Sequence, residues 1–231
     1  MKRFYTAVAV GPAAGGFAVL LDGKPVRTPA RRTLAVPTLA LATAIAAEWS
    51  EQVETIAPST MRLTRLATTV TDLMPDRRGD AVAEVAAFAG TDLLCYRASS
   101  PASLVGRQTA TWQPWLDWAE RQFDARLAVA EGVMPVSQPQ AALRALRAPV
   151  ERLDDWRLVG LHGAVTLLGS LVLGLAVERG ALAAEAALDA ALLDELFEIE
   201  QWGEDPEQAR RHARLRADLA AIERYLALIA G

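Results

Sequence analysis

A run of apolar residues without any formal charge, Leu158 to Val177, is the feature that most limits what this chain can fold into. It is about as long as a span across a lipid bilayer, so a membrane helix is one interpretation. Against insertion, the run contains His162, Thr166, Ser170 and four glycines. A helix that is apolar all round is also typical of the centre of a soluble bundle, where glycines let helices approach closely. We predict a buried helix over these residues.

The composition indicates a folded protein. The chain has 231 residues, of which 52% are hydrophobic and 23% charged, which is enough for a large core and a charged surface. The net charge is −4 and the arginines are interleaved with acids, so the sequence lacks the basic face that a nucleic-acid partner requires. The single cysteine, Cys95, excludes an intramolecular disulfide and suits a reducing compartment. Because it lies in an apolar run, we predict a buried structural thiol.

The first part of the chain has the pattern of short strands. Residues Phe4–Val10 alternate, Phe17–Leu21 form a second β-rich run, and Asp22-Gly23 is a tight hairpin signal. Near Pro37 the pattern changes to a helical period. We therefore predict an α+β fold, with a small antiparallel β-rich domain over 1–37 and a larger all-helical domain over 38–231. The opening residues lack a convincing cleavage site, and we predict no signal peptide.

The helical region carries recognisable start and stop signals. Thr38 can cap a first helix, and Pro75 is expected to stop a later one. Ser100-Pro101 is expected to supply a cap followed by proline in the first helical position. Tryptophans at three-residue spacing in the helix that follows are more typical of core packing than of a binding stripe. These tryptophans are Trp112, Trp115 and Trp118.

The densest acidic cluster lies at Leu192–Gln208, which we call the acidic junction. It joins a helix predicted over Ala183–Trp202 to a last helix that Pro206 opens and that runs towards Ala230. If one place carries chemistry or recognises a partner, this junction is the first candidate. The alternative is that its acids form a solvated helix face and an N-cap.

Several kinds of catalytic site have no motif in this chain. There is no G-x-x-x-x-G-K-[ST] loop and no G-x-G-x-x-G after a strand, so nucleotide binding is unsupported. Asp194 and Glu198 lie one helical turn apart and could bind a hard cation, although such pairs are more often a solvated face. A metal-dependent hydrolase that uses Asp194, Glu198 and Glu204 is the alternative function. If the chain is not an enzyme, the remaining function is recognition of a partner protein. The acids beside Trp202 suit an apolar partner surface rimmed by arginines.

Eight segments, taken in order, carry a resemblance over nearly the whole chain. They are Lys2–Tyr5, Leu20–Pro29, Glu48–Trp49, Met61–Ala67, Thr91–Arg97, Glu131–Val136, Thr166–Leu171 and Ile199–Asp205. Together they resemble the family of assembly chaperones that bind the alpha subunit of the F-type ATP synthase catalytic head. In two places the chain departs from the family pattern. Members often have Trp-Gln where this chain has Phe197-Glu198, and a small or polar residue where it has Leu168.

The resemblance implies a small β-rich domain and a larger helical one in a non-enzymatic chaperone of the bacterial cytoplasm. Such a protein holds the free alpha subunit until a beta subunit replaces it. It needs no cofactor and no metal of its own, and the nucleotide sites belong to the client. Nucleic acid and membrane insertion are not expected. The residues that the resemblance indicates for client binding are Glu200, Trp202, Gly203, Glu204 and Asp205.

Overall fold

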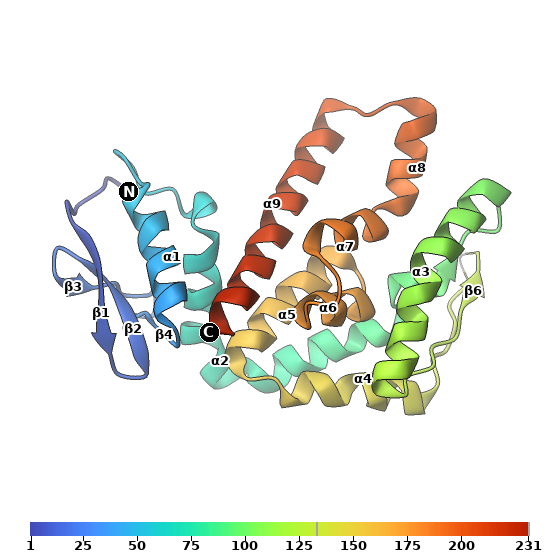
Figure 1. Cartoon of the computed structure of the whole chain (residues 1–231), viewed down its shortest axis with the longest axis horizontal. Coiled ribbons are helices and arrows are strands. Elements are labelled where there is room, and N and C mark those ends of the chain that lie inside the picture. Colours follow the sequence, from blue (N-terminus) through green and yellow to red (C-terminus); the bar gives the residue numbers. More distant parts are fainter. Residues whose placement is uncertain (133, 231) are drawn as a thin grey trace. The chain divides into compact units, whose positions relative to one another are not determined.

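The computed structural model describes residues 1–132 and 134–230, and its architecture agrees with the predicted α+β class (Figure 1). The strands are β1 (Val8–Ala13), β2 (Gly16–Leu21), β3 (Lys24–Pro25), β4 (Ala35–Val36), β5 (Tyr96–Arg97) and β6 (Ala130–Glu131). The α-helices in the described part are α1 (Leu39–Ser50), α2 (Arg62–Ala87), α3 (Ala102–Phe123), α4 (Gln140–Arg152), α5 (Asp155–Leu168), α6 (Leu171–Glu178), α7 (Ala184–Ala191), α8 (Leu193–Trp202) and α9 (Pro206–Ile229). A small antiparallel sheet is thus followed by a larger helical region.

The chain groups into two compact units. The first unit contains residues 1–78 and 155–160 together with the end of the chain from Ala221, and the second contains 79–154 and 161–220. Helices α2, α5 and α9 contribute residues to both units.

The sheet of the first unit is built around β2. This strand pairs antiparallel with β1 over its whole length, from Val8 opposite Leu21 to Ala13 opposite Gly16, and also with β3 and β4. The predicted Asp22-Gly23 hairpin between β2 and β3 is confirmed, with φ of 47° and 79° at these residues. Both values are positive, which glycine accepts without steric cost.

Helix α1 covers the sheet of the first unit (Figure 1). The predicted cap at Thr38 is confirmed, since its Oγ1 accepts the Leu41 N–H at 3.1 Å and donates to the Leu228 carbonyl at 2.6 Å. Leu41 and Ile45 are fully buried. Because α1 packs on β1 and β2, the compact unit that holds the sheet continues past residue 37. The division into domains 1–37 and 38–231 stays a prediction.

Helix α2 passes through Pro75 without a break, so the predicted helix end at this proline was wrong. A proline inside a helix leaves the carbonyl four residues earlier without its N–H partner, and here that carbonyl belongs to Thr71. The Arg32 guanidinium supplies the missing donor, with Nη1 2.7 Å from the Thr71 oxygen. A side chain from the loop before β4 therefore compensates the proline.

We predicted one helix over the apolar run 158–177, but the structure has two. Helix α5 ends at Leu168, Gly169 adopts a φ of 64°, and Ser170 caps α6 by accepting the Leu173 N–H at 3.0 Å. Every residue of α6 is buried, which confirms burial for this part of the run. No described helix combines the length and the apolar character that a membrane crossing requires.

A buried carboxylate supports the break between α5 and α6. Asp92 is fully buried in the second unit, where its two oxygens accept the Leu94 N–H at 3.1 Å and the Val172 N–H at 3.0 Å. Burial raises the pKa of Asp92 to about 6, against the effect of the hydrogen bonds that it accepts. Cys95 is also buried, as predicted, and burial raises the pKa of its thiol to about 12.

Helix α3 begins at Ala102, and the predicted cap by Ser100 was wrong. Pro101 occupies the N-cap position in extended backbone, and its carbonyl accepts the N–H groups of Leu104 and Val105.

The tryptophans of this helix have different environments. Trp112 is buried and donates its indole N–H to the Ala190 carbonyl at 2.8 Å, which confirms its core role. Trp115 and Trp118 are half-buried.

Candidate interaction surface at the acidic junction

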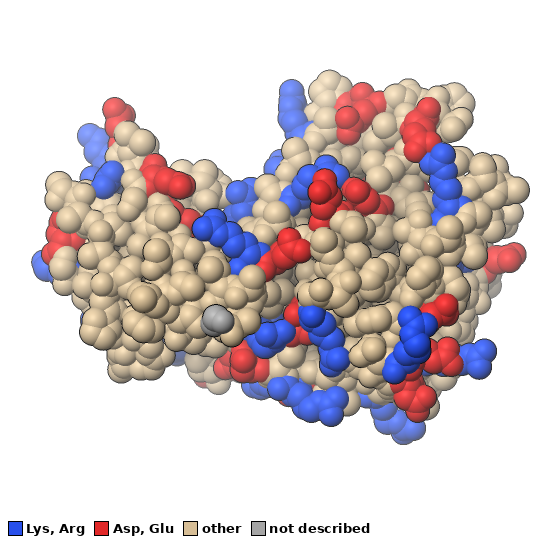
Figure 2. All heavy atoms as spheres, viewed as in Figure 1, with Lys and Arg blue, Asp and Glu red and all other residues tan. Residues whose placement is uncertain are grey.

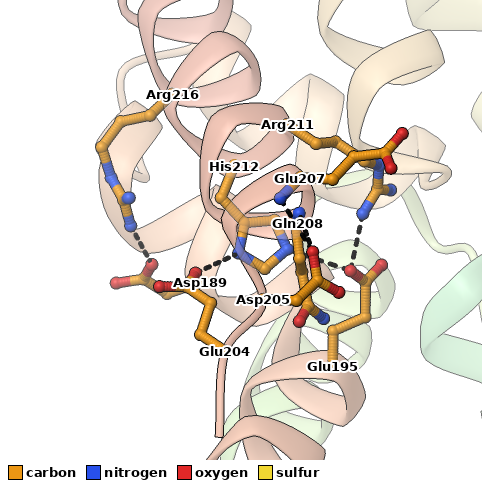
Figure 3. Close-up of polar contacts among 9 residues, drawn as sticks. All are labelled: Asp189, Glu195, Glu204, Asp205, Glu207, Gln208, Arg211, His212 and Arg216. Carbon is orange, nitrogen blue, oxygen red and sulfur yellow. Dashed lines mark hydrogen bonds and ion pairs between the residues drawn. The ribbon is translucent and has the colours of Figure 1, made fainter.

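Helices α8 and α9 are joined by three residues whose conformations end one helix and begin the next. Gly203 has a φ of 86° and donates its N–H to the Ile199 carbonyl at 2.8 Å, so it closes α8. The Asp205 Oδ1 accepts the N–H groups of Glu207 and Gln208 at 2.8 and 2.9 Å (Figure 3). These donors have no partner within the first turn of a helix, so Asp205 caps α9.

A buried histidine fastens α9 to α8 and to the turn (Figure 3). His212 is only 5% exposed, its Nε2 lies 3.0 Å from Glu195 Oε2, and its Nδ1 lies 3.5 Å from Glu204 Oε1. Arg211 adds an ion pair to the same Glu195 oxygen at 2.6 Å. Burial acts to raise the pKa of Glu195, but the hydrogen bonds from His212 and Arg211 outweigh it and hold this pKa below its ordinary value. Glu195 thus carries charge where the two helices meet.

Helix α3 contributes a second set of contacts to α8. Arg107 lies 2.7 Å from Glu200, and its guanidinium lies over the Phe197 ring at 5.2 Å from the ring centroid. Gln108, which is buried, donates to Asp194 Oδ1 at 2.7 Å. These contacts of Arg107 and Gln108 position α8 between α3 and α9 within the second unit.

Four of the five residues that the resemblance indicates have a structural role in this arrangement. Glu200 pairs with Arg107, Gly203 makes the turn, and Glu204 contacts His212. Asp205 caps α9. Trp202 differs, because it is a large apolar side chain with 88% of its surface exposed. An exposed tryptophan beside a fixed turn is the side chain here that is best suited to a partner.

The acids of the alternative hydrolase site do not come together. Asp194 is bonded to Gln108, whereas Glu204 is directed to His212 from the turn. Within residues 1–132 and 134–230, no group of three or more His, Cys, Asp or Glu side chains is arranged to hold a metal ion. The alternative that uses Asp194, Glu198 and Glu204 has no support in the structure.

Charged side chains of both signs lie next to one another on the molecular surface. Figure 2 shows Lys and Arg beside Asp and Glu over much of the visible face, without a broad field of one sign. At the junction the pattern has a local cause, since Arg211 pairs with Glu195 at 2.6 Å and Arg107 with Glu200 at 2.7 Å. Part of the acidic charge of the junction is therefore compensated.

The sequence interpretation missed His212 and its partner Glu195. A signal was available, because His212 precedes Leu215, Leu219 and Ile222 at the spacing of one helix face. That spacing places the imidazole on the inward side of α9, and a buried imidazole needs a partner. Helix α8, which the turn brings back alongside α9, supplies it.

The chain is similar to known proteins over nearly its whole length. The family model described as ATP12 chaperone protein matches residues 2–120. The crystal structure of Atp12 from Paracoccus denitrificans is 42% identical with a TM-score of 0.93, and the match covers 99% of this chain and 98% of that one. The Atu1473 protein of Agrobacterium tumefaciens is 40% identical with the same TM-score, over 98% of this chain and 85% of that one.

A more distant relative comes from a eukaryote. The mitochondrial protein atp12 of Schizosaccharomyces pombe is 22% identical over 214 residues, which is 87% of this chain and 74% of the relative. The family model covers half of the sequence, and the bacterial structures extend the likeness to nearly all of it. The chain belongs to the ATP12 chaperone family and is similar throughout to its bacterial members.

Proposed function

We propose that this chain, an ATP12 chaperone for ATP synthase assembly, binds the free alpha subunit of the F-type catalytic head and covers its subunit interface until a beta subunit replaces it. The protein acts by binding, without catalysis and without a cofactor, in the bacterial cytoplasm. The client contacts a surface that includes Glu200, Trp202, Gly203, Glu204 and Asp205. The observation that carries this surface is the 88% exposure of Trp202 at a turn that is held on both sides.

The physical basis is a preorganised apolar contact. Burial of an exposed tryptophan in a partner contributes on the order of 2 kcal/mol or more when it lies at the centre of an interface. The contacts of His212 with Glu195 and Glu204 fix the turn before the client arrives, which lowers the entropy that binding costs. The acids near the turn favour a client surface rimmed by arginines.

Co-expression tests the proposal directly. The cognate alpha subunit is produced with or without this chain, and soluble alpha is measured together with co-elution on size exclusion. We expect alpha to stay soluble and to elute with the chain, and added beta to displace it. Equal solubility of alpha in both cultures, with no complex, would contradict the function. A complex that beta cannot displace would identify a permanent partner instead of a chaperone.

A matched pair of variants tests the surface. Trp202→Ala removes an exposed side chain, so we expect the fold to keep its stability while the affinity for alpha falls at least about tenfold. Val53→Ala removes another exposed apolar side chain, 78% exposed and in the first unit, and should leave the affinity unchanged. If Trp202→Ala binds alpha as well as Val53→Ala does, the junction is not the contact surface.

A further inference from the structure

A cavity of about 470 Å³ opens in the first unit, apart from the acidic junction. Its volume lies in the range of roughly 300–1,000 Å³ that is typical of ligand sites. Residues that line it include Phe4, Tyr5, Lys24, Pro25, Arg27 and Trp49. They come from the N-terminal segment, from β3 and the residues after it, and from the end of α1. The proposed contact at Trp202 makes no use of this site.

The aromatic wall of the cavity is held in place before any ligand binds. Tyr5 is buried and donates its hydroxyl to the Trp49 carbonyl at 2.7 Å. Its ring contacts Trp49 edge-on with centroids 5.7 Å apart, and contacts Phe4 in the same manner at 5.4 Å. Arg3 fixes the backbone of this segment, because it donates to the Tyr5, Thr6 and Gln52 carbonyls.

Part of this wall is apolar surface that faces solvent. Phe4 is 64% exposed and Met1, which also lines the cavity, is 77% exposed. Exposed aromatic and apolar side chains that surround a hollow are typical of a surface that takes an apolar group from a partner.

The charged groups that line the cavity leave an excess of positive charge. Asp22 is its only acid among the lining residues, and that carboxylate already accepts the backbone N–H groups of Thr6 and Ala7. Lys24 and Arg27 supply two cations. The indole N–H of Trp49 is buried and has no hydrogen-bond partner in the described part of the chain.

We propose that this cavity binds a peptide segment of the client in which an apolar side chain lies next to a carboxylate. The apolar side chain packs in the cavity against the wall that Phe4, Tyr5 and Trp49 form, and the carboxylate faces Lys24 and Arg27. This inference rests on the proposed function for the identity of the client. It adds a second contact, in the first unit, to the one at the acidic junction.

The experiment uses the whole protein labelled with ¹⁵N in its tryptophan indoles. The Trp49 resonance is assigned with Trp49→Phe, and overlapping 15-residue peptides of the cognate alpha subunit are titrated. We expect peptides with an acid beside a large apolar residue to shift the Trp49 signal and to leave that of Trp202 unchanged. Lys24→Glu should weaken their binding about fivefold or more, and the double change with Arg27→Glu further still. Arg65→Glu, an exposed cation of the same unit outside the cavity, should have no effect.

The outcomes separate this inference from the proposed function. If alpha binds the protein but no peptide shifts Trp49, and Lys24→Glu leaves the affinity for alpha unchanged, the cavity inference fails alone. If alpha does not bind at all, an acetylated Glu-Leu-Glu peptide still tests the cavity, and a shift of Trp49 that Lys24→Glu abolishes supports it. Binding of anionic lipid vesicles in place of every peptide would overturn it.

Discussion

The Nε2 atom of His212 lies 3.0 Å from Oε2 of Glu195, and this contact joins α9 to α8 beneath an exposed loop of three residues. The imidazole is buried, whereas Trp202 in the same junction is 88% exposed. The residues that shape the candidate surface are therefore different from Trp202, the residue that we propose contacts the partner. Stability and binding can be tested separately because of this division.

Replacement of His212 by alanine should destabilise the second unit. The change removes a buried side chain and leaves Glu195 and Glu204 without their imidazole partner, so we expect a loss of about 1–3 kcal/mol in the free energy of unfolding. Urea denaturation followed by circular dichroism measures it. Arg211→Ala, which removes an exposed ion pair to the same Glu195 oxygen, should cost under about 1 kcal/mol. Equal losses in the two variants would show that burial of the imidazole is not the source of the stability that His212 contributes.

Glu195 should make the protein less stable in acid. Its pKa is below the ordinary 4.5 in the folded protein, so between these values the unfolded chain binds more protons. The contribution of Glu195 is thus present above about pH 4.5 and is lost as the pH falls through the folded pKa. Unfolding free energies measured from pH 6 to pH 3 should show this loss, and Glu195→Gln should reduce the slope. An unchanged slope in Glu195→Gln would mean that other carboxylates cause it.

Asp92 should act in the opposite direction. Burial raises its pKa from 3.8 to about 6, so between these values the folded protein binds more protons than the unfolded chain. Asp92 therefore lowers the free energy of unfolding as the pH rises through this window. Asp92→Asn should remove that trend between about pH 4 and 6, measured with urea at constant ionic strength. The same trend in the variant would show that Asp92 is ionised at low pH in the folded protein.

The packing of α6 on α5 should tolerate no side chain at Gly174. A Cβ atom at this position would lie 2.4 Å from Val165 Cγ2. We expect Gly174→Ala to cost about 1–3 kcal/mol through overpacking. Gly106→Ala is the control, because a Cβ there meets nothing within 4 Å and alanine favours a helix. The two variants should shift the urea midpoint in opposite directions, and a stabilised Gly174→Ala would show that α5 and α6 can separate.

Features set by neighbouring residues could be predicted from the sequence. The Asp22-Gly23 hairpin, the Thr38 cap and the start of α9 at Pro206 each depend on the chemistry of a few adjacent positions. The α+β class followed from the change of period near Pro37. These signals are local, so they can be recognised in a single sequence.

Two of the errors, at Pro75 and at the break between α5 and α6, arose where a distant side chain contributes to the local structure. Arg32 supplies the donor that lets α2 continue through Pro75, and Asp92 binds the first turn of α6 after the break at Gly169. The partner residues are 39 and 80 positions apart in these hydrogen bonds. No periodicity reveals such pairs. In the junction, by contrast, the position of His212 on the inward face of α9 could have been read, and its pairing with Glu195 could not.

Two changes at Asp205 should separate its role as a cap from any contact with the client. Asparagine keeps the oxygen that accepts the Glu207 and Gln208 N–H groups but removes the charge, whereas alanine removes both. We expect Asp205→Asn to keep its unfolding free energy within a few tenths of a kcal/mol and Asp205→Ala to lose about 1 kcal/mol. The affinity for the alpha subunit is then measured for both. If the charge contacts the client, Asp205→Asn binds more weakly although it is stable, and if Asp205 only caps α9, Asp205→Asn binds as the unchanged protein does.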